Sequence, residues 1–153
     1  MALYLVQHGQ SAAKDVDPSR PLTEEGRSTV KRIAQIAAGY GVSVSMIRHS
    51  GKRRAQETAE IMASLLNPAE GVRQSDGLNP NDDVRNLSRH ISETDNVMLV
   101  GHLPFMEKLL SFLVAGSPDI TVMKFQQGGI VCLDRDHEGG SWFIKWALMP
   151  KIQ

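Results

Sequence analysis

Two apolar segments of this chain each end at a histidine that has a glycine as its immediate neighbour. His8 follows the apolar run at residues 3–7, and His102 follows the run at residues 96–100. Open α/β sheets bind ligands beyond the carboxyl ends of their strands, and glycine there lets a ligand or another backbone approach closely. A neutral imidazole can attack phosphorus, and an imidazolium can bind a phosphoryl oxygen. The two histidines therefore indicate phosphoryl chemistry at one edge of a sheet.

Strand and helix patterns alternate through most of the chain. Helices are expected at residues 23–39, 52–66, 84–91 and 105–114. Strands are expected at residues 3–7, 42–47, 72–74, 97–100, 122–125, 129–134 and 142–148. This order predicts an α/β fold, a single-domain three-layer sandwich whose mostly parallel central sheet has helices on both faces. A length of 153 residues, without an internal repeat or linker, predicts one domain over residues 1–153.

Composition and charge exclude several classes of partner. The 17 Lys and Arg residues balance 17 Asp and Glu residues, so we expect neither nucleic acid nor a membrane as a partner. No apolar run approaches the ~20 residues of a membrane span, and the N-terminus does not resemble a signal peptide. The single cysteine, Cys132, lies in a predicted apolar strand, where we expect a core residue. One cysteine also excludes an internal disulfide and predicts a cytoplasmic location.

A phosphoryl group requires fixed cations, and the chain offers several arginines. Lys52, Arg53 and Arg54 lie in the first turn of a predicted helix, where the helix dipole favours an anion. We expect Lys52 and Arg53 to be solvated, and Arg20 taken alone resembles a surface arginine. No metal-ligand spacing and no glycine-rich nucleotide loop is present, so no metal site is predicted.

Four motifs together resemble those of the histidine phosphatase superfamily, the phosphoglycerate-mutase-like enzymes, and most of all its SixA-type phosphohistidine phosphatases. The motifs are His8-Gly9, Arg20-Pro21-Leu22-Thr23-x-x-Gly26, Ser50-x-x-x-Arg54-Ala55-x-x-Thr58 and Gly101-His102-Leu103-Pro104. The resemblance implies that His8 is the nucleophile and that Arg54 and His102 bind the phosphoryl oxygens. It places Arg20 and Gly9 at the same pocket and implies no metal and no organic cofactor.

The first motif departs from the family pattern, because Gln7 replaces its arginine. A glutamine amide still donates hydrogen bonds, and we expect it to contact phosphate, but it brings no charge. Losing a charge-assisted contact in the transition state costs on the order of 2–4 kcal/mol, roughly 30- to 1000-fold in rate. Arg20 and Arg48 are the candidates for the missing charge.

A second departure concerns the general acid that many superfamily members use on phosphate esters. The central loop offers only Asp82 and Asp83, and an aspartate before a helix is more often its N-cap, which is what we expect here. A phosphohistidine needs little help from an acid, because its leaving imidazole protonates near neutral pH. The expected substrate is thus a phosphorylated protein histidine or a small phosphoramidate, reached between loops 10–19 and 79–83.

Two alternatives remain open. One is a small-molecule phosphomonoesterase that uses Asp82 or Asp83 as its acid. The other is a catalytically weakened phosphate- or phosphoprotein-binding module, marked by Gln7.

Overall fold

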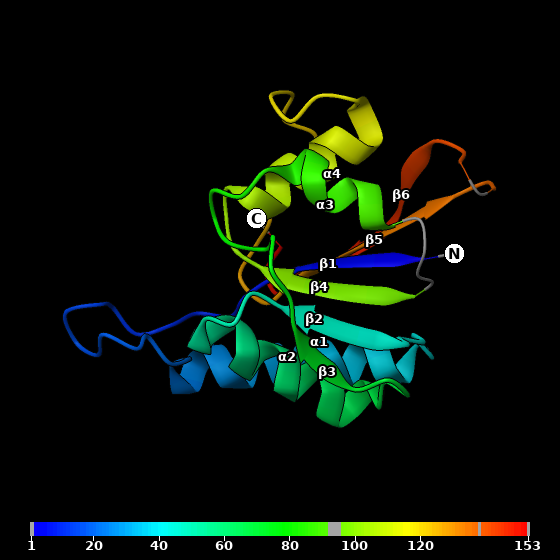
Figure 1. The fold of residues 1–153 in the computed structure, drawn as a ribbon. Helices are drawn as coiled ribbons and strands as arrows, with labels where there is room; N and C mark the ends of the chain where they lie inside the picture. Colours follow the sequence, from blue (N-terminus) through cyan, green and yellow to red (C-terminus); the bar gives the residue numbers. More distant parts are fainter. Residues whose placement is uncertain (1, 92–95, 138, 153) are drawn as a thin grey trace.

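The computed structural model describes residues 2–91, 96–137 and 139–152. It contains one six-stranded sheet with the strand order β3-β2-β4-β1-β5-β6 (Figure 1). The strands are β1 (Leu3–Gln7), β2 (Met46–His49), β3 (Val72–Gln74), β4 (Val97–Gly101), β5 (Ile130–Arg135) and β6 (Trp142–Leu148). The pairs among β1 to β4 are parallel, whereas β5 is antiparallel to β1 and β6 to β5. The mostly parallel sheet is as the sequence predicts, and the antiparallel strands β5 and β6 complete one edge of it.

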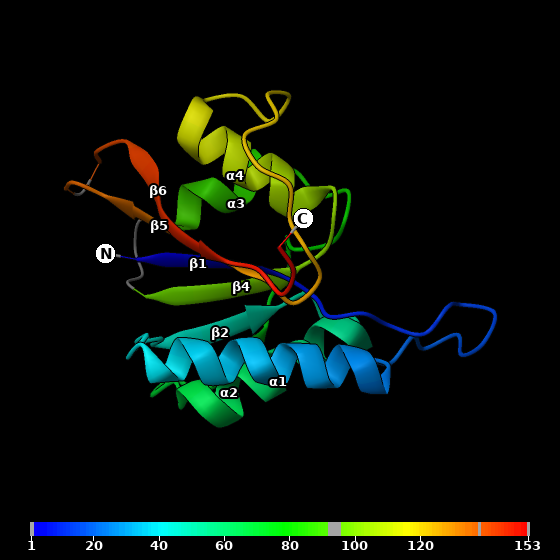
Figure 2. The same ribbon diagram turned by 180° about the vertical axis from the view of Figure 1, so that it is seen from behind.

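Helices cover both faces of this sheet, which confirms the predicted three-layer sandwich. They are α1 (Glu24–Gly39), α2 (Arg53–Leu66), α3 (Val84–Ile91) and α4 (Phe105–Ala115). Helices α1 and α2 lie on one face, and α3 and α4 lie on the other (Figures 1 and 2).

The central strands are apolar throughout because both of their faces are covered. In β1, Leu3 and Leu5 belong to the core beneath α3 and α4, whereas Tyr4 and Val6 belong to the core beneath α1 and α2. Successive strand side chains point to opposite faces, so every residue of β1 is buried. This packing fixes the strand ends, where the two histidines lie.

The start of α1 follows from its sequence. Thr23 is the N-cap, and its side-chain oxygen accepts a hydrogen bond from the Gly26 N–H at 2.9 Å. Two glutamates occupy the first turn, at the positive end of the helix dipole.

Two predicted strands differ from the structure. The strand expected at residues 42–47 begins only at Met46, because the Val42 N–H is still bonded to the Ala37 carbonyl in the turn that ends α1. The segment 122–125 is not a strand, although Phe125 is buried. The Phe125 N–H donates to the Glu107 carboxylate on α4 at 3.0 Å, so this backbone is held by a helix side chain instead of a sheet.

Cys132 is buried in β5, as predicted. Within the described ranges, no helix has the length and apolar character that crossing a membrane requires.

Candidate active site

The two histidines lie side by side because their strands are neighbours in the sheet. In the parallel pair of β1 and β4, Gln7 is opposite Gly101, so the next residue after each strand is brought to the same edge. The His8 N–H donates to the Gly101 carbonyl at 3.0 Å, which continues the pairing one residue further. The His8 and His102 ring centroids are 5.0 Å apart, with an angle of 51° between the ring planes. The convergence predicted from the sequence is therefore present.

The His8 ring is held in one tautomer. Its Nδ1 lies 2.7 Å from the Gly9 carbonyl oxygen, which can only accept, so Nδ1 carries the hydrogen. The remaining nitrogen, Nε2, then has its lone pair available. Burial, together with the positive charges of Arg54 and Arg20, lowers the pKa of His8 to about 4, although the Gly9 bond opposes this shift. At neutral pH the His8 ring is therefore uncharged, the form in which an imidazole can act as a base or as a nucleophile.

The His102 ring is positioned by Ser50, which directly follows β2, the parallel neighbour of β4. Its Nε2 lies 2.6 Å from Ser50 Oγ, and the same oxygen accepts the Lys52 N–H at 3.3 Å. Ser50 Oγ can accept this N–H and still donate its own hydrogen to Nε2, an arrangement that places the hydrogen of His102 on Nδ1. Burial and the nearby His8, Arg54, Lys52 and Arg20 lower the pKa of His102 to about 3, so the ring is neutral.

His102 Nδ1 is buried and, among the described residues, has no hydrogen-bond partner. Arg54 Nε, in the first turn of α2, is in the same situation. Two buried donors without a protein acceptor are costly unless a ligand accepts from them. Both suit an oxyanion.

Arg20 also belongs to this site. Its charge acts on His8, Arg54 and His102 and lowers the pKa of each of them. Two side-chain bonds hold it, from Nε to the Ala12 carbonyl at 3.2 Å and from a terminal nitrogen to Ser11 Oγ at 3.4 Å. Two guanidinium groups close enough to repel each other form a site for a doubly charged anion.

The backbone of Arg20 is in the left-handed region, at a φ of 49°. This conformation is uncommon for a residue other than glycine and costs of order 1 kcal/mol or more. Sequence alone gives no sign of it.

Thr58 is the last residue of the third sequence motif, and only the structure shows which groups it contacts. Its Oγ1 accepts the Gly9 N–H at 2.9 Å and donates to the Arg54 carbonyl at 2.8 Å, and its side chain is fully buried. Thr58 thus connects the loop of the nucleophile to the helix that presents Arg54. The spacing of four residues between Arg54 and Thr58 places both on one side of α2.

Gly9 is required by packing. A Cβ on Gly9 would lie 2.7 Å from the Val30 side chain and 3.3 Å from the Gly26 carbonyl oxygen. The absence of a side chain at Gly9 therefore lets this loop pack directly against α1. Both backbone groups of Gly9 are bonded within the protein, so a contact between Gly9 and phosphate stays a prediction.

Gln7 is buried at the end of β1, and its Oε1 has no partner within the described part of the chain. Of the two candidates for the missing charge, Arg48 donates to Ser75 Oγ at 2.7 Å, and burial lowers its pKa. Only Arg20 of the two acts electrostatically on His8 and His102. Arg20 is therefore the stronger candidate.

The two loop aspartates form hydrogen bonds within their own loop. Asp82 accepts the Asn79 N–H at 2.8 Å, and Asp83 accepts the Arg85 N–H at 2.9 Å at the start of α3. The second bond is that of an N-cap, as expected. In the described residues, no group of three or more His, Cys, Asp or Glu side chains is placed to hold a metal ion.

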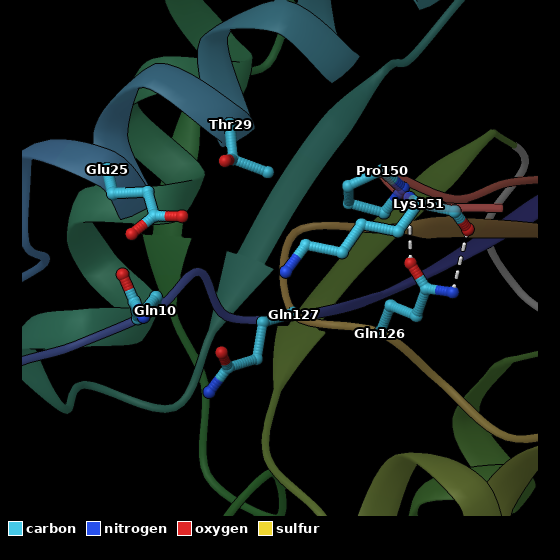
Figure 3. A pocket seen from close by; sticks show the side chains of 7 residues that line it. All are labelled: Gln10, Glu25, Thr29, Gln126, Gln127, Pro150 and Lys151. Carbon is cyan, nitrogen blue, oxygen red and sulfur yellow. Dashed lines mark hydrogen bonds between the residues drawn. The ribbon is translucent and has the colours of Figure 1, made fainter. Parts of the chain in front are cut away.

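A hollow of about 220 Å³ lies beside the end of β1 (Figure 3). Gln10, two residues after His8, is part of its lining, and α1 forms one wall. On the opposite side, the Gln126 amide bonds to both backbone groups of Lys151, at 3.0 and 2.9 Å. Four segments that lie far apart in the sequence line this hollow, so no local sequence pattern predicts it.

Comparison with known proteins agrees with this geometry. Residues 3–80 match the sequence profile of the histidine phosphatase superfamily (branch 1). The phosphohistidine phosphatase SixA of Escherichia coli K12 is 26% identical over 156 residues, covering 98% of this chain and 94% of SixA. An uncharacterized protein of Picosynechococcus is 35% identical over 113 residues, covering 68% of this chain and 67% of that protein.

Solved structures show the same similarity. The protein histidine phosphatase SixA in complex with tungstate superposes with a TM-score of 0.86 at 26% identity, covering 98% of this chain and 97% of SixA. The superfamily profile covers half of the present sequence and includes His8, Arg20 and Arg54. The chain belongs to the histidine phosphatase superfamily.

Proposed function

We propose that this protein is a phosphohistidine phosphatase that removes the phosphoryl group through a phosphohistidine intermediate on His8. The observation that carries the proposal is the bond between His8 Nδ1 and the Gly9 carbonyl, which leaves a neutral Nε2 beside two arginines and His102. The similarity to SixA, whose name states this activity, supports the choice of substrate.

The reaction proceeds in two displacements. In the first, His8 Nε2 attacks phosphorus, the bond between phosphorus and the substrate nitrogen breaks, and the substrate imidazole takes up a proton. In the second, water attacks the phosphorus on His8, which releases inorganic phosphate and returns the electron pair to Nε2. Arg54, Arg20 and the His102 N–H bind the equatorial oxygens, where negative charge develops. No step requires a metal or a cofactor.

The leaving group favours a phosphoramidate over an ester. An alkyl phosphate needs a strong acid at its oxygen, and the loop candidates Asp82 and Asp83 both accept loop N–H groups. An imidazole leaving group protonates without one, given its pKa of ~6.5. The substrate is thus a protein phosphohistidine or a small phosphoramidate, and nothing in the geometry favours the phosphomonoesterase alternative.

Gln7 favours a second candidate, a phosphate- or phosphoprotein-binding module with little turnover. A charge-assisted hydrogen bond exceeds a neutral one by ~1.5 kcal/mol, about tenfold in rate. Because Arg20 already supplies charge to the pocket, we expect Gln7→Arg to raise turnover by at most about tenfold. A rise of several hundredfold from a near-zero baseline would establish the binding module instead.

Two further proposals concern the domain organisation and the cellular location of the protein. We propose that the whole chain is one histidine-phosphatase-like domain, since strands from β1 to β6 form a single sheet. We also propose that it acts in the cytoplasm, because its one cysteine fits a reducing compartment.

The experiment is hydrolysis of a phosphohistidine-bearing protein, with His8→Ala as the blank. We expect turnover that disappears in the variant while its fold and phosphate binding persist. Full activity in His8→Ala would reject the mechanism. No turnover in a wild-type protein that still binds phosphate would favour the binding module.

A further inference from the structure

Residues 10–21 form an arm that projects past the edge of the sheet where the strands end (Figures 1 and 2). Its base is closed by a bridge between Ser11 and Leu22 and by a hydrogen bond from the Ala12 N–H to the Pro21 carbonyl at 2.8 Å. The arm begins immediately after His8-Gly9, so it stands next to the phosphoryl site.

The tip of the arm is an ordered structure with its own hydrogen bonds. The N–H groups of Val16 and Asp17 both donate to the Ala13 carbonyl, at 3.1 and 3.0 Å. The Asp17 carboxylate accepts from the N–H and the hydroxyl of Ser19, at 3.0 and 2.8 Å. A tip held in one conformation loses little entropy when it binds a partner.

The arm is also braced against the catalytic elements. Arg53, at the start of α2, donates to Ser19 Oγ at 2.8 Å. Arg20, at the end of the arm, bonds to Ala12 and Ser11 while its charge acts on His8. The arm and the phosphoryl site are therefore one continuous structure.

Val16 is 78% exposed at the tip of this arm. A single exposed apolar side chain is ordinary on a protein surface. Here it lies on a braced projection that begins directly after His8-Gly9 and extends past the edge of the sheet where His8 lies. A protein that presents its histidine to His8 brings further surface to this edge of the molecule, whereas a free phosphoamino acid has no such surface.

We propose that the arm docks against the surface of a folded protein that presents its phosphohistidine to His8, with Val16 as the apolar contact. This rests on the proposed function and selects the protein substrate over the small phosphoramidate. The flanking charges of Lys14, Asp15 and Asp17 differ in sign, so the apolar contact, and not net charge, provides the recognition.

The test compares hydrolysis of the same phosphorus–nitrogen bond in two substrates. One is free phosphohistidine, and the other is phosphomyoglobin, which is myoglobin phosphorylated on its histidines with phosphoramidate. We expect Val16→Asp to lower kcat/KM on phosphomyoglobin by about tenfold, since it replaces a buried apolar contact with a charge. Its kcat/KM on free phosphohistidine stays at the wild-type value, and Val16→Leu keeps both activities. Tyr40→Ser is the matched control, because Tyr40 is 84% exposed at the far end of α1 and lies away from the arm.

Three results would overturn the docking role. Equal losses of Val16→Asp on both substrates would show that the arm acts through Arg20. Unchanged activity on phosphomyoglobin would show that the tip touches nothing, and an equal loss in Tyr40→Ser would show a non-specific effect of the surface. Absence of wild-type activity on both phosphomyoglobin and free phosphohistidine would instead reject the proposed function, and the docking role with it.

Discussion

The hydroxyl of Thr58 links the nucleophile to the phosphate-binding helix, and its removal is a sharp test of how this site is built. Thr58→Val keeps the shape of the side chain but leaves the buried Gly9 N–H without its acceptor at 2.9 Å. An unsatisfied buried donor costs ~1–3 kcal/mol of unfolding free energy. For a chain of this length that corresponds to a decrease in Tm of roughly 2–12 °C.

The variant Thr58→Ser is the matched control. It keeps the hydroxyl and removes one methyl group, which costs about 0.8 kcal/mol. Thermal and urea unfolding should therefore rank wild type above Thr58→Ser, and Thr58→Ser above Thr58→Val. Turnover should follow the same order, because the Gly9 carbonyl orients the His8 ring. If Thr58→Val were as stable and as active as wild type, the hydroxyl would have no part in holding the loop.

Other predictions follow from the same site. Burial, with the charges of Arg54 and Arg20, lowers the pKa of His8 to about 4, so an NMR titration of its ring should have a midpoint near pH 4. A midpoint near pH 6.5, the ordinary value for histidine, would contradict the buried neutral base. His8 and His102 bind protons less readily in the folded protein than in the unfolded chain, so the free energy of unfolding should decrease as pH falls from about 6.5 towards 4. Urea unfolding at several pH values measures this decrease. Arg54→Ala should weaken vanadate binding by at least about 30-fold, since it removes charge-assisted bonds of ~2 kcal/mol or more. The control Arg89→Ala, at an exposed position on α3, should leave the affinity unchanged, and calorimetry that finds equal affinities for Arg54→Ala and wild type would remove Arg54 from the pocket.

The convergence of the two histidines could be predicted because it depends only on local patterns and on sheet topology. Two apolar strands that end in His8 and His102 must meet if they are parallel neighbours, and they are. The N-caps Thr23 and Asp83 are also local features. Interactions between residues that lie within a few positions of each other can be predicted from sequence patterns.

The contacts that complete the site depend on long-range packing. Ser50 reaches His102 across 52 positions, and Thr58 reaches Gly9 across 49. The proximity of Arg20 depends on an arm whose backbone turns through a positive φ, which no residue-type preference at an arginine predicts. The strand expected at 122–125 was wrong for a related reason, because Phe125 packs into the core beneath α3 and α4 while its backbone N–H bonds to Glu107 of α4 and to no strand.

The most direct test of the central claim is to locate the phosphoryl group on the enzyme during turnover. The protein would be mixed with myoglobin that carries phosphohistidines and has been freed of phosphoramidate, and the reaction would be quenched in alkali, where a phosphohistidine survives. Peptides of the protein would then be mapped by mass spectrometry. We predict one phosphoryl group on the peptide that contains His8, on Nε2, and none in His8→Ala. A phosphoryl group on any other residue, or turnover that persists in His8→Ala, would contradict the role of His8 as the nucleophile.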